Sequence, residues 1–553
     1  MLEGPNLYFT RPAVKLTLAV PGWLRASEPK VAGIAERLGL HGARIGAPGT
    51  EQRRRFIARV ARRETGRLAA AAGTRLSVRA RAGSAPDEIV VAFPWRHRGS
   101  AEALGEETAA AMAAILRRSP DRVVREAAAR IGRVDPGGEP SCPEPAVPVI
   151  SVTGTNGKTT TVRLVAHIVR SAGRQVAYSS TDGVYRDGEL VKQGDYSGFG
   201  GAATALAQEP DVAVLETARG GILLRGIGVL HNDVAVVTNV SEDHLDLHGV
   251  RTLDQLAEVK ATITRITRPE GWDVLNADDP RALAMRRGAT GRLWLFSLEH
   301  DHPAVRDVLA EGGRATVPLD GAITVLEGHD ARPLVALIDV PMTLAGISSI
   351  YVQNALAATA AALAVGLPER AVARGLRTFV LDPESNPGRA NLFALDGRVV
   401  VLDYAHNEAG MSGLAEICHG LRRKGHDVWI AFGTAGDRTD RILHRFAQAA
   451  ARGADHVAIA ELARYLRGRD REDLIARLRE GAADGGASDV PVYEDELHAL
   501  RDTIERSRPG DVIAVTALAQ RPELFAELGG RGAARLGPGA VRRLVRVAAA
   551  SWA

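Results

Sequence analysis

From about residue 146 onward, short apolar runs alternate with longer stretches in which apolar residues recur at helical spacing. The runs lie at 149–153, 175–179, 211–216, 233–240, 273–276 and 292–296. Each run has the length of a strand, and each intervening stretch can hold a crossover helix. The pattern predicts an α/β fold in which a parallel sheet carries helices on its faces.

A second series of this kind begins near residue 386, with strand candidates at 398–403, 427–432, 455–460 and 511–515. Between the series lie short strand-like runs at 314–345 and an Ala-rich helix at 348–365. The chain opens with strand-like runs at 14–20 and 88–93, helical stretches at 52–72 and 101–118, and a Pro/Gly-rich linker at 135–145. We therefore predict three domains: an N-terminal α+β domain at 1–140, a central parallel-sheet domain at 146–385 and a C-terminal α/β domain at 386–553.

Composition and charge argue against several classes of protein. The formal net charge is +4 and the arginines form no aromatic-rich basic cluster, so no nucleic-acid partner is expected. No apolar run could cross a bilayer and no leader pattern opens the chain, which predicts a cytoplasmic protein without a membrane partner. The two cysteines suggest neither a disulfide framework nor a metal site.

Lysine is rare in this chain, since only 6 of the 70 Lys and Arg residues are lysines. Where arginine replaces lysine so freely, the remaining lysines are candidates for chemistry that arginine cannot perform, such as losing a proton. Lys158 and Lys260 are the two lysines that lie in informative sequence contexts.

The apolar run at 149–153 breaks into a glycine-rich turn and then a helix-forming segment. This order of strand, loop and helix aims several backbone N–H groups into one concavity, which suits the phosphates of a nucleoside triphosphate. Lys158 would add a mobile cation, and Thr159 a hydroxyl for Mg²⁺. The strict P-loop spacing would place a glycine where Val152 stands, so a solvated Gly-rich turn is the alternative. The predicted nucleotide-binding residues of this loop are Gly154, Thr155, Asn156, Gly157, Lys158, Thr159 and Thr160.

Acidic and imidazole side chains follow two further strands. Glu216 ends the run 211–216 beside glycines, and its carboxylate is a suitable Mg²⁺ ligand. A helix N-cap carboxylate is the alternative there. His244 follows the run 233–240 within a polar cluster, and we predict it as a second metal ligand with Asp243 and Asp246 as orienting groups. The alternative for His244 is a capped turn residue without a metal.

Further candidates lie downstream of these strands. Lys260 sits on a predicted amphipathic helix, where a solvated lysine is an equally simple reading. Asn276 ends a strand and offers an amide that can both donate to and accept from an adenine edge, although alone it is only a turn signature. Arg389, Asp403 and His406 follow a domain junction, and they could meet triphosphate and ribose when two lobes close.

Taken in order and spacing, these motifs resemble the Mur ligase superfamily. The likeness covers about residues 147–520 and is greatest to the Mur-type module of the cyanophycin synthetases. The opening residues 2–6 resemble, more weakly, the start of the accessory N-terminal domain of those enzymes. The segments that carry the closer likeness are STDGVY at 180–185, GDYSG at 194–198, ETARGG at 216–221 and NPGRANLF at 386–393.

Two departures from the related families shape the expectation. Cyanophycin synthetases carry an ATP-grasp module between these two parts, whereas here the Pro/Gly linker joins them directly. One of the two ligase activities is therefore expected to be missing. The uridine-nucleotide-binding domain of the peptidoglycan ligases is not recognisable either, which argues against a UDP-linked substrate.

The resemblance implies an ATP-dependent ligase of carboxylates and amines that works through an acyl phosphate. The implied partners are an amino acid and a carboxylate-bearing peptide or small molecule, such as an aspartate-type side chain and a basic amino acid. The protein itself is also a possible homo-oligomer. The first alternative is a non-catalytic protein, either a nucleotide-binding scaffold or a partner of a separate ATP-grasp enzyme. The second alternative is a P-loop nucleotidase or motor.

The resemblance also implies roles for the candidate residues. ATP and two Mg²⁺ ions are the expected cofactors, and the catalytic and metal-binding residues would be Lys158, Thr159, Glu216, His244 and a carbamylated Lys260. Asn276 would contact adenine, Asp403 the ribose, and Arg389 and His406 the phosphates. From their positions alone, Tyr196, Ser197 and Arg219 are expected to face the acceptor.

Overall fold

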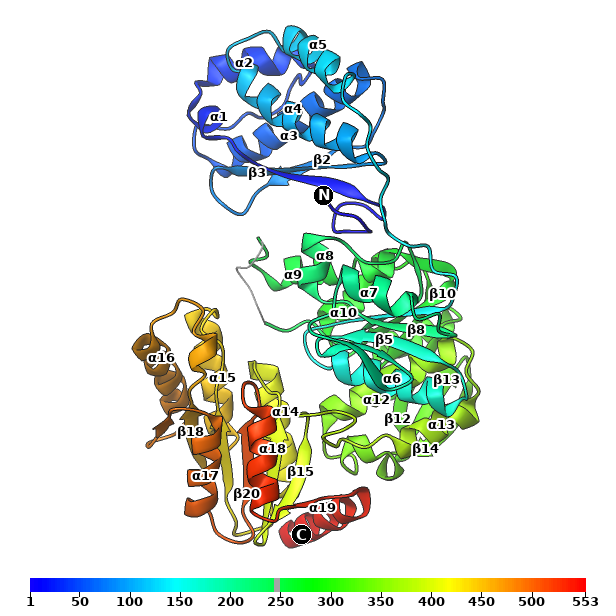
Figure 1. The fold of residues 1–553 in the computed structure, drawn as a ribbon, viewed down its shortest axis with the longest axis vertical. Coiled ribbons are helices and arrows are strands. Elements are labelled where there is room, and N and C mark those ends of the chain that lie inside the picture. Colours follow the sequence, from blue (N-terminus) through cyan, green and yellow to red (C-terminus); the bar gives the residue numbers. More distant parts are fainter. Residues whose placement is uncertain (243–248) are drawn as a thin grey trace.

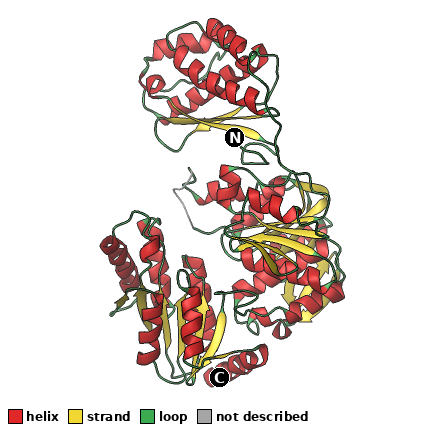
Figure 2. Cartoon of the chain, in the orientation of Figure 1, coloured by secondary structure: helices red, strands yellow, loops and turns green. Residues whose placement is uncertain are grey.

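The computed structural model describes residues 1–242 and 249–553 and contains three β-sheets that follow one another along the chain (Figures 1 and 2). Residues 243–248, which include His244, Asp243 and Asp246, lie outside the described residues. Among the described helices, none has the length and apolar character needed to cross a membrane.

The N-terminal lobe is a three-stranded antiparallel sheet with helices on one face (Figure 1). Its strands lie in the order β1 (Ala13–Ala19), β3 (Glu88–Pro94) and β2 (Arg79–Ala82). The predicted strands at 14–20 and 88–93 are thus confirmed as β1 and β3. The helices are α1 (Pro21–Arg25), α2 (Glu28–Arg37), α3 (Glu51–Ala71), α4 (Arg98–Ala114) and α5 (Pro120–Ile131).

The central lobe is built on an eleven-stranded sheet whose middle is parallel and whose two edges are antiparallel hairpins. The parallel strands, in sheet order, are β12 (Arg314–Leu319), β11 (Arg292–Phe296), β10 (Thr267–Asn276), β9 (Asn232–Val237), β4 (Val149–Thr153), β8 (Val212–Glu216) and β5 (Val176–Ser180). The edges are formed by β13 (Ala322–Glu327) and β14 (Asp330–Ala336), and by β6 (Gly183–Arg186) and β7 (Glu189–Gln193).

Helices cover both faces of the central sheet, so β4, β5 and β8 are buried along their whole length. One face packs against α6 (Lys158–Ser171), α12 (Ser349–Ala364) and α13 (Glu369–Thr378). The other face packs against α7 (Phe199–Leu206), α8 (Arg219–Leu224), α9 (Leu253–Lys260), α10 (Pro280–Ala284) and α11 (Pro303–Ala310). Short 3₁₀ turns complete the lobe at η1 (Ile263–Arg265), η2 (Met285–Gly288), η3 (Leu337–Asp339) and η4 (Pro341–Thr343).

The C-terminal lobe is a smaller α/β layer with a mostly parallel sheet. Its strands lie in the order β19 (Val492–Tyr493), β18 (His456–Ala460), β17 (Val428–Phe432), β20 (Val512–Thr516), β16 (Arg398–Asp403), β15 (Asn391–Leu395) and β21 (Ala534–Arg535). Its helices are α14 (Glu408–Leu421), α15 (Asp440–Arg452), α16 (Arg471–Asp484), α17 (Glu496–Arg506), α18 (Arg521–Gly530) and α19 (Pro538–Trp552), with the 3₁₀ turn η5 (Ala463–Tyr465).

The predicted α/β organisation is confirmed, and two strands of the central lobe differ from the predicted bounds by more than one residue. The strand expected at 233–240 ends at Val237, because residues 238–240 leave the sheet to contact the loop after β4. The strand expected at 273–276 is the buried end of the longer β10, whose first half contains proline, glycine and exposed positions that hide it in the sequence.

Candidate active site

The glycine-rich loop after β4 has the backbone that a phosphate cradle requires. Gly154 and Gly157 have positive φ values of 154° and 83°. A Cβ at Gly154 would lie 1.8 Å from the Thr238 hydroxyl, and one at Gly157 would lie 2.3 Å from the Asn354 amide oxygen. Both positions therefore need glycine, since an L side chain would be strained and would clash. Helix α6 begins directly after Gly157, so its first N–H groups point into the same concavity.

A neighbouring strand holds this loop in place. Asn239, which follows β9, accepts a hydrogen bond from the Thr155 amide through its carbonyl (2.9 Å) and one from the Asn156 amide through its side chain (2.9 Å). Asn239 lies near the end of the run 233–240 that was predicted as a strand, and nothing in the sequence indicates this contact. The contact joins residues more than eighty positions apart, which local patterns cannot reveal.

Glu216 and Thr159 form a buried pair at the start of α6. The Thr159 hydroxyl donates to Glu216 Oε2 at 2.8 Å, and Glu216 is 2% exposed. Its second oxygen, Oε1, has no hydrogen-bond partner among the described residues. A buried carboxylate oxygen without a partner beside a hydroxyl is a donor set that suits a hard divalent cation. Among the described residues, no group of three or more His, Cys, Asp or Glu side chains that could hold a metal ion is present.

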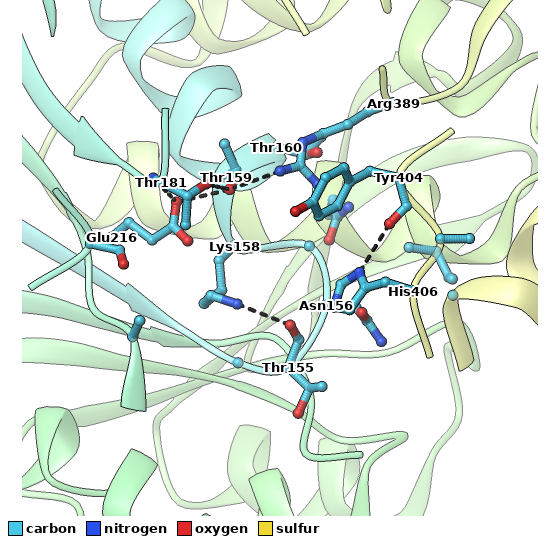
Figure 3. Close-up of a pocket in the computed structure, with 18 of the residues that line it drawn as sticks. Thr155, Asn156, Lys158, Thr159, Thr160, Thr181, Glu216, Arg389, Tyr404 and His406 are labelled. Atoms are coloured by element: carbon cyan, nitrogen blue, oxygen red, sulfur yellow. Dashed lines mark hydrogen bonds between the residues drawn. The ribbon is translucent and has the colours of Figure 1, made fainter. Parts of the chain in front are cut away.

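The two predicted lysines both reach the loop, and Figure 3 shows Lys158 directed at the Thr155 carbonyl. Lys158 folds back so that its ammonium donates to the Thr155 carbonyl at 2.9 Å. Lys260, the last residue of α9, is 3% exposed and its Nζ donates to the Gly154 carbonyl at 2.5 Å. The reading of Lys260 as a solvated lysine is therefore wrong, because the folding of α9 against the loop buries it.

The C-terminal lobe brings three predicted residues to the same place. Arg389 approaches the Thr159 hydroxyl at 3.4 Å, and its guanidinium lies over the Tyr404 ring. The His406 ring nitrogen Nδ1 contacts the Tyr404 carbonyl at 2.9 Å. Asp403 accepts from the Ala390 amide at 2.8 Å, and burial raises the pKa of its carboxyl.

These groups line one cavity of about 770 Å³ between the central and C-terminal lobes. Its wall includes all seven predicted loop residues from Gly154 to Thr160, together with Glu216, Lys260, Arg389, Asp403 and His406. The structure thus brings together every described candidate except Asn276 and Tyr196; Tyr196 is not among the residues that line this cavity. The cavity wall also contains Asp195, Ser197, Gly198, Arg219, Gly220 and Gly221, on the segments around α7 and α8.

Asn276 lines a second cavity of about 510 Å³ on the other side of the loop, which also includes Asn156, Asn239 and Asp279. Its side-chain nitrogen donates to the Thr238 carbonyl at 2.8 Å, and its oxygen accepts from the Asp278 amide. The amide is therefore engaged in shaping the strand ends, and its contact with adenine stays a prediction. The walls of the two cavities share Asn156, Ile350 and Gly413.

Contacts between the two lobes involve residues that were not predicted to bind or react. The Asn407 amide donates to Asn156 Oδ1 at 2.9 Å and accepts from Asn156 Nδ2 at 3.1 Å. The 5% exposed Arg163 on α6 contacts the Asn386 side chain at 3.3 Å and Asp182 at 2.8 Å. Asp182 and Asn386 lie in two of the segments that carry the family resemblance, and Asn407 directly follows His406 and caps α14.

A parallel-sheet lobe with a phosphate-binding loop, closed by a second α/β lobe, defines a nucleotide-dependent enzyme of the P-loop class. Family models agree with this architecture. The Mur ligase middle domain matches residues 152–362, and the Mur ligase glutamate ligase domain matches residues 388–518.

Among curated relatives, cyanophycin synthetase from Crocosphaera subtropica is 37% identical over 371 residues, covering 67% of this chain and 42% of that one. UDP-N-acetylmuramyl-tripeptide synthetase from Deinococcus radiodurans is 30% identical over 386 residues, covering 67% and 73%. The chain thus spans about two fifths of the length of the cyanophycin synthetases that it matches. It belongs to the Mur ligase family, a family of ATP-dependent ligases.

A solved structure shares the fold. The bifunctional folylpolyglutamate synthase/dihydrofolate synthase from Yersinia pestis, complexed with AMPPNP and Mn ion, aligns with a TM-score of 0.52 and 20% identity. The alignment covers 70% of this chain and 90% of that one.

Proposed function

We propose that this protein is an ATP-dependent ligase that joins a carboxylate to the amino group of an amino acid through an acyl phosphate. One observation carries the proposal: the buried Thr159 and Glu216 pair, with its unpartnered carboxylate oxygen, lies in one cavity with Lys158 and Arg389. This arrangement would put metal ligands and two cations around the position that we propose for the terminal phosphate of ATP.

The two cavities suggest how the substrates divide between them. The nucleoside would occupy the smaller cavity beside Asn276, and the triphosphate would cross the loop toward Glu216. The acid and the amine would then bind in the larger cavity. A carboxylate oxygen of the acid attacks the terminal phosphorus and ADP leaves. The amine nitrogen next attacks the acyl carbon, phosphate leaves, and the amine loses a proton.

The protein's own groups would stabilise the charge that develops in both steps. Lys158 can exchange the Thr155 carbonyl for a phosphate oxygen, and Arg389 enters from the other lobe. Mg²⁺ held by Thr159 and Glu216 would neutralise phosphate charge. Asp403 and His406 line the same wall, and we assign them to the ribose and the phosphates.

We also propose that Lys260 is carbamylated and that it and His244 serve a second metal. Support for the first part is the burial of the Lys260 side chain against the loop, because burial disfavours the ammonium that must lose a proton to react with CO₂. Carbon-13 NMR after equilibration with labelled bicarbonate is expected to show a carbamate signal that Lys260→Ala lacks. An identical spectrum for both proteins would contradict carbamylation.

The relatives suggest the substrate class. A curated relative is named cyanophycin synthetase, and the Pro/Gly linker stands where those enzymes carry another module, so we propose a single ligase activity. An acid with an aspartate-type side chain and a basic amino acid are the first substrates to test. We retain the domain boundaries 1–140, 146–385 and 386–553 as proposals for dissecting the chain.

Phosphate and ADP release in the presence of amino acids and short acidic peptides tests the function. A ligase releases phosphate only with the right pair, a scaffold never does, and a nucleotidase does so without an amine. Lys158→Ala is expected to abolish the release, while Lys30→Ala at an exposed position of α2 leaves it unchanged. Release that needs no amine, or that survives in Lys158→Ala, would overturn the proposal.

A further inference from the structure

The first residues of the N-terminal lobe form a rigid loop, which we call the N-terminal loop (residues 2–9). Its shape is fixed by Asn6, which is 2% exposed. The Asn6 side chain donates to the Gly4 and Arg11 carbonyls and accepts from the amides of Tyr8 and Phe9. Trp95 on the lobe's own scaffold donates to the Leu2 carbonyl at 3.0 Å. The lobe therefore presents this loop in one conformation.

The N-terminal loop docks on a segment of the central lobe, residues 225–230, which we call the docking segment. The Glu3 amide donates to the Arg225 carbonyl at 2.8 Å, and the Ile227 amide donates to the Pro5 carbonyl at 2.7 Å. The backbones touch so closely that a Cβ at Gly4 would lie 1.8 Å from the Ile227 carbonyl oxygen. Such an approach admits only glycine unless the backbone shifts.

Charged side chains reinforce this contact. Glu3 Oε1 pairs with the Arg225 guanidinium at 2.8 Å, and Glu3 Oε2 accepts from the Ser141 hydroxyl at 2.7 Å. The Ser141 hydrogen bond and the Arg225 guanidinium together lower the pKa of Glu3. The Glu3 side chain is 15% exposed, so the pair is shielded from water more than an ordinary surface ion pair.

The docking segment is continuous with the wall of the larger cavity. The amides of Arg225 and Gly226 donate to the Gly221 carbonyl at 3.0 and 3.1 Å, at the end of α8. The Arg225 guanidinium lies 4.5 Å from the centre of the Phe199 ring, at the start of α7. Gly221 packs against Gly198, where a Cβ would lie 2.7 Å from the Gly198 Cα. The wall residues just before α7 and on α8 are Ser197, Gly198, Arg219, Gly220, Gly221 and Leu224.

A second contact of the N-terminal lobe reaches α9. Arg81 on β2 pairs with Glu258 at 3.6 Å, two residues before Lys260, and its guanidinium lies 5.2 Å from the centre of the Tyr8 ring. Figure 1 shows the N-terminal lobe beside α8 and α9 and away from the C-terminal lobe. The first contact thus lies directly after α8 and the second on α9, and both helices carry cavity residues.

We propose that Glu3 and Gly4 are positioning residues for the acceptor side of the cavity: through the docking segment they hold α8, and with it Arg219 and Gly221, in the geometry that receives the carboxylate substrate. This inference rests on the proposed function. The nucleoside cavity beside Asn276 shares no residue with the α7 and α8 wall. A loosened docking segment should therefore weaken binding of the acid and leave binding of ATP unchanged.

The test compares Gly4→Ala with Gly33→Ala, a control on α2 where an added Cβ meets nothing within 4 Å. Gly4→Ala is expected to speed amide hydrogen exchange at residues 219–227 by roughly fivefold or more, with exchange in α3 unchanged. In the ligase assay it should raise the KM for the acid roughly fivefold and leave the KM for ATP as in wild type. Gly33→Ala should change none of these.

Glu3→Gln provides a variant that adds no bulk, and a cycle with Arg225→Gln isolates the pair. Each single change is expected to raise the acid KM, and the double variant should add little to either. The inference would be overturned if Gly4→Ala and Glu3→Gln both matched wild type in two measurements. These are the rate of amide hydrogen exchange at residues 219–227 and the KM for the acid. Hydrogen exchange is measured without turnover, so it reports the docking contact even if the protein forms no amide. Failure of the ligase assay alone would therefore count against the proposed function and not against the docking contact.

Discussion

At the scale of single residues, the site depends on what burial does to side chains of ordinary type. Glu216 ends a fully buried strand and keeps one oxygen without a partner among the described residues. Leaving a buried carboxylate oxygen unsatisfied is costly unless a ligand completes it. Lys260 is likewise drawn out of solvent, and its ammonium meets the backbone of the phosphate loop. Neither side chain is explained by the stability of the fold alone.

Glu216→Gln tests the first of these residues. The amide keeps the size of the side chain and can still accept from Thr159, but it loses the charge that attracts a cation. We expect the Mg²⁺ concentration for half-maximal phosphate release to rise at least ~10-fold, with little change in thermal stability. Glu189→Gln on the exposed strand β7 is the matched control. An unchanged Mg²⁺ dependence in Glu216→Gln would remove this carboxylate from the metal site.

At the scale of elements, the structure is easiest to predict from the sequence where segments that are adjacent in the chain determine it. The order of strand, glycine loop and helix at 149–171 is local, and the positive φ values of Gly154 and Gly157 explain why glycines stand there. The grip of Asn239 on the loop and the pairing of Asn156 with Asn407 escape sequence reasoning. They depend on how distant strands and lobes are stacked, and an asparagine in a turn has many local uses.

The buried carboxyl of Asp273 on strand β10 leads to a prediction about the pH dependence of stability. Asp273 is buried there, accepts from the Thr267 hydroxyl at 2.7 Å and from the Gly291 amide at 2.9 Å, and burial raises its pKa to about 7. Asn at this position can accept from Gly291 and donate to Thr267, so the packing should survive. As the pH rises from about 4 to about 7, the unfolded chain releases the Asp273 proton while the folded chain keeps it.

Wild type should therefore lose stability relative to Asp273→Asn across that window, by up to about 4 kcal/mol for a shift of about 3 pH units. Below pH ~4 and above pH ~7 the difference between the two proteins should be constant. Chemical denaturation of both proteins at several pH values measures it. A difference in unfolding free energy that stays flat between pH ~4 and pH ~7 would show that burial does not shift this carboxyl.

At the scale of the whole molecule, the larger cavity exists because two lobes meet over one loop. The central lobe contributes the loop, Glu216 and Lys260, and the C-terminal lobe contributes Arg389, Asp403 and His406. The amide pair between Asn156 and Asn407 joins the lobes at the loop itself. Binding of a triphosphate at the loop should therefore be coupled to the relative position of the lobes.

Asn407→Ser separates this contact from the stability of α14. Serine can still cap the helix, but it is too short to exchange two hydrogen bonds with Asn156. We expect thermal stability near that of wild type and a roughly tenfold lower kcat/KM for ATP. His419→Gln, at an exposed position of the same helix outside both cavities, should leave both unchanged. A kcat/KM equal to that of wild type in Asn407→Ser would show that the amide pair does not serve closure.

The most direct test of the proposed acyl-phosphate route traces a carboxylate oxygen of the acid with an isotope label. Once an accepted acid has been found, it is labelled with ¹⁸O in its carboxylate and the released phosphate is analysed by mass spectrometry. A route through an acyl phosphate transfers one carboxylate oxygen to phosphate, so each phosphate formed with an amide should carry one ¹⁸O atom. Amide formation that releases only unlabelled phosphate would contradict the account.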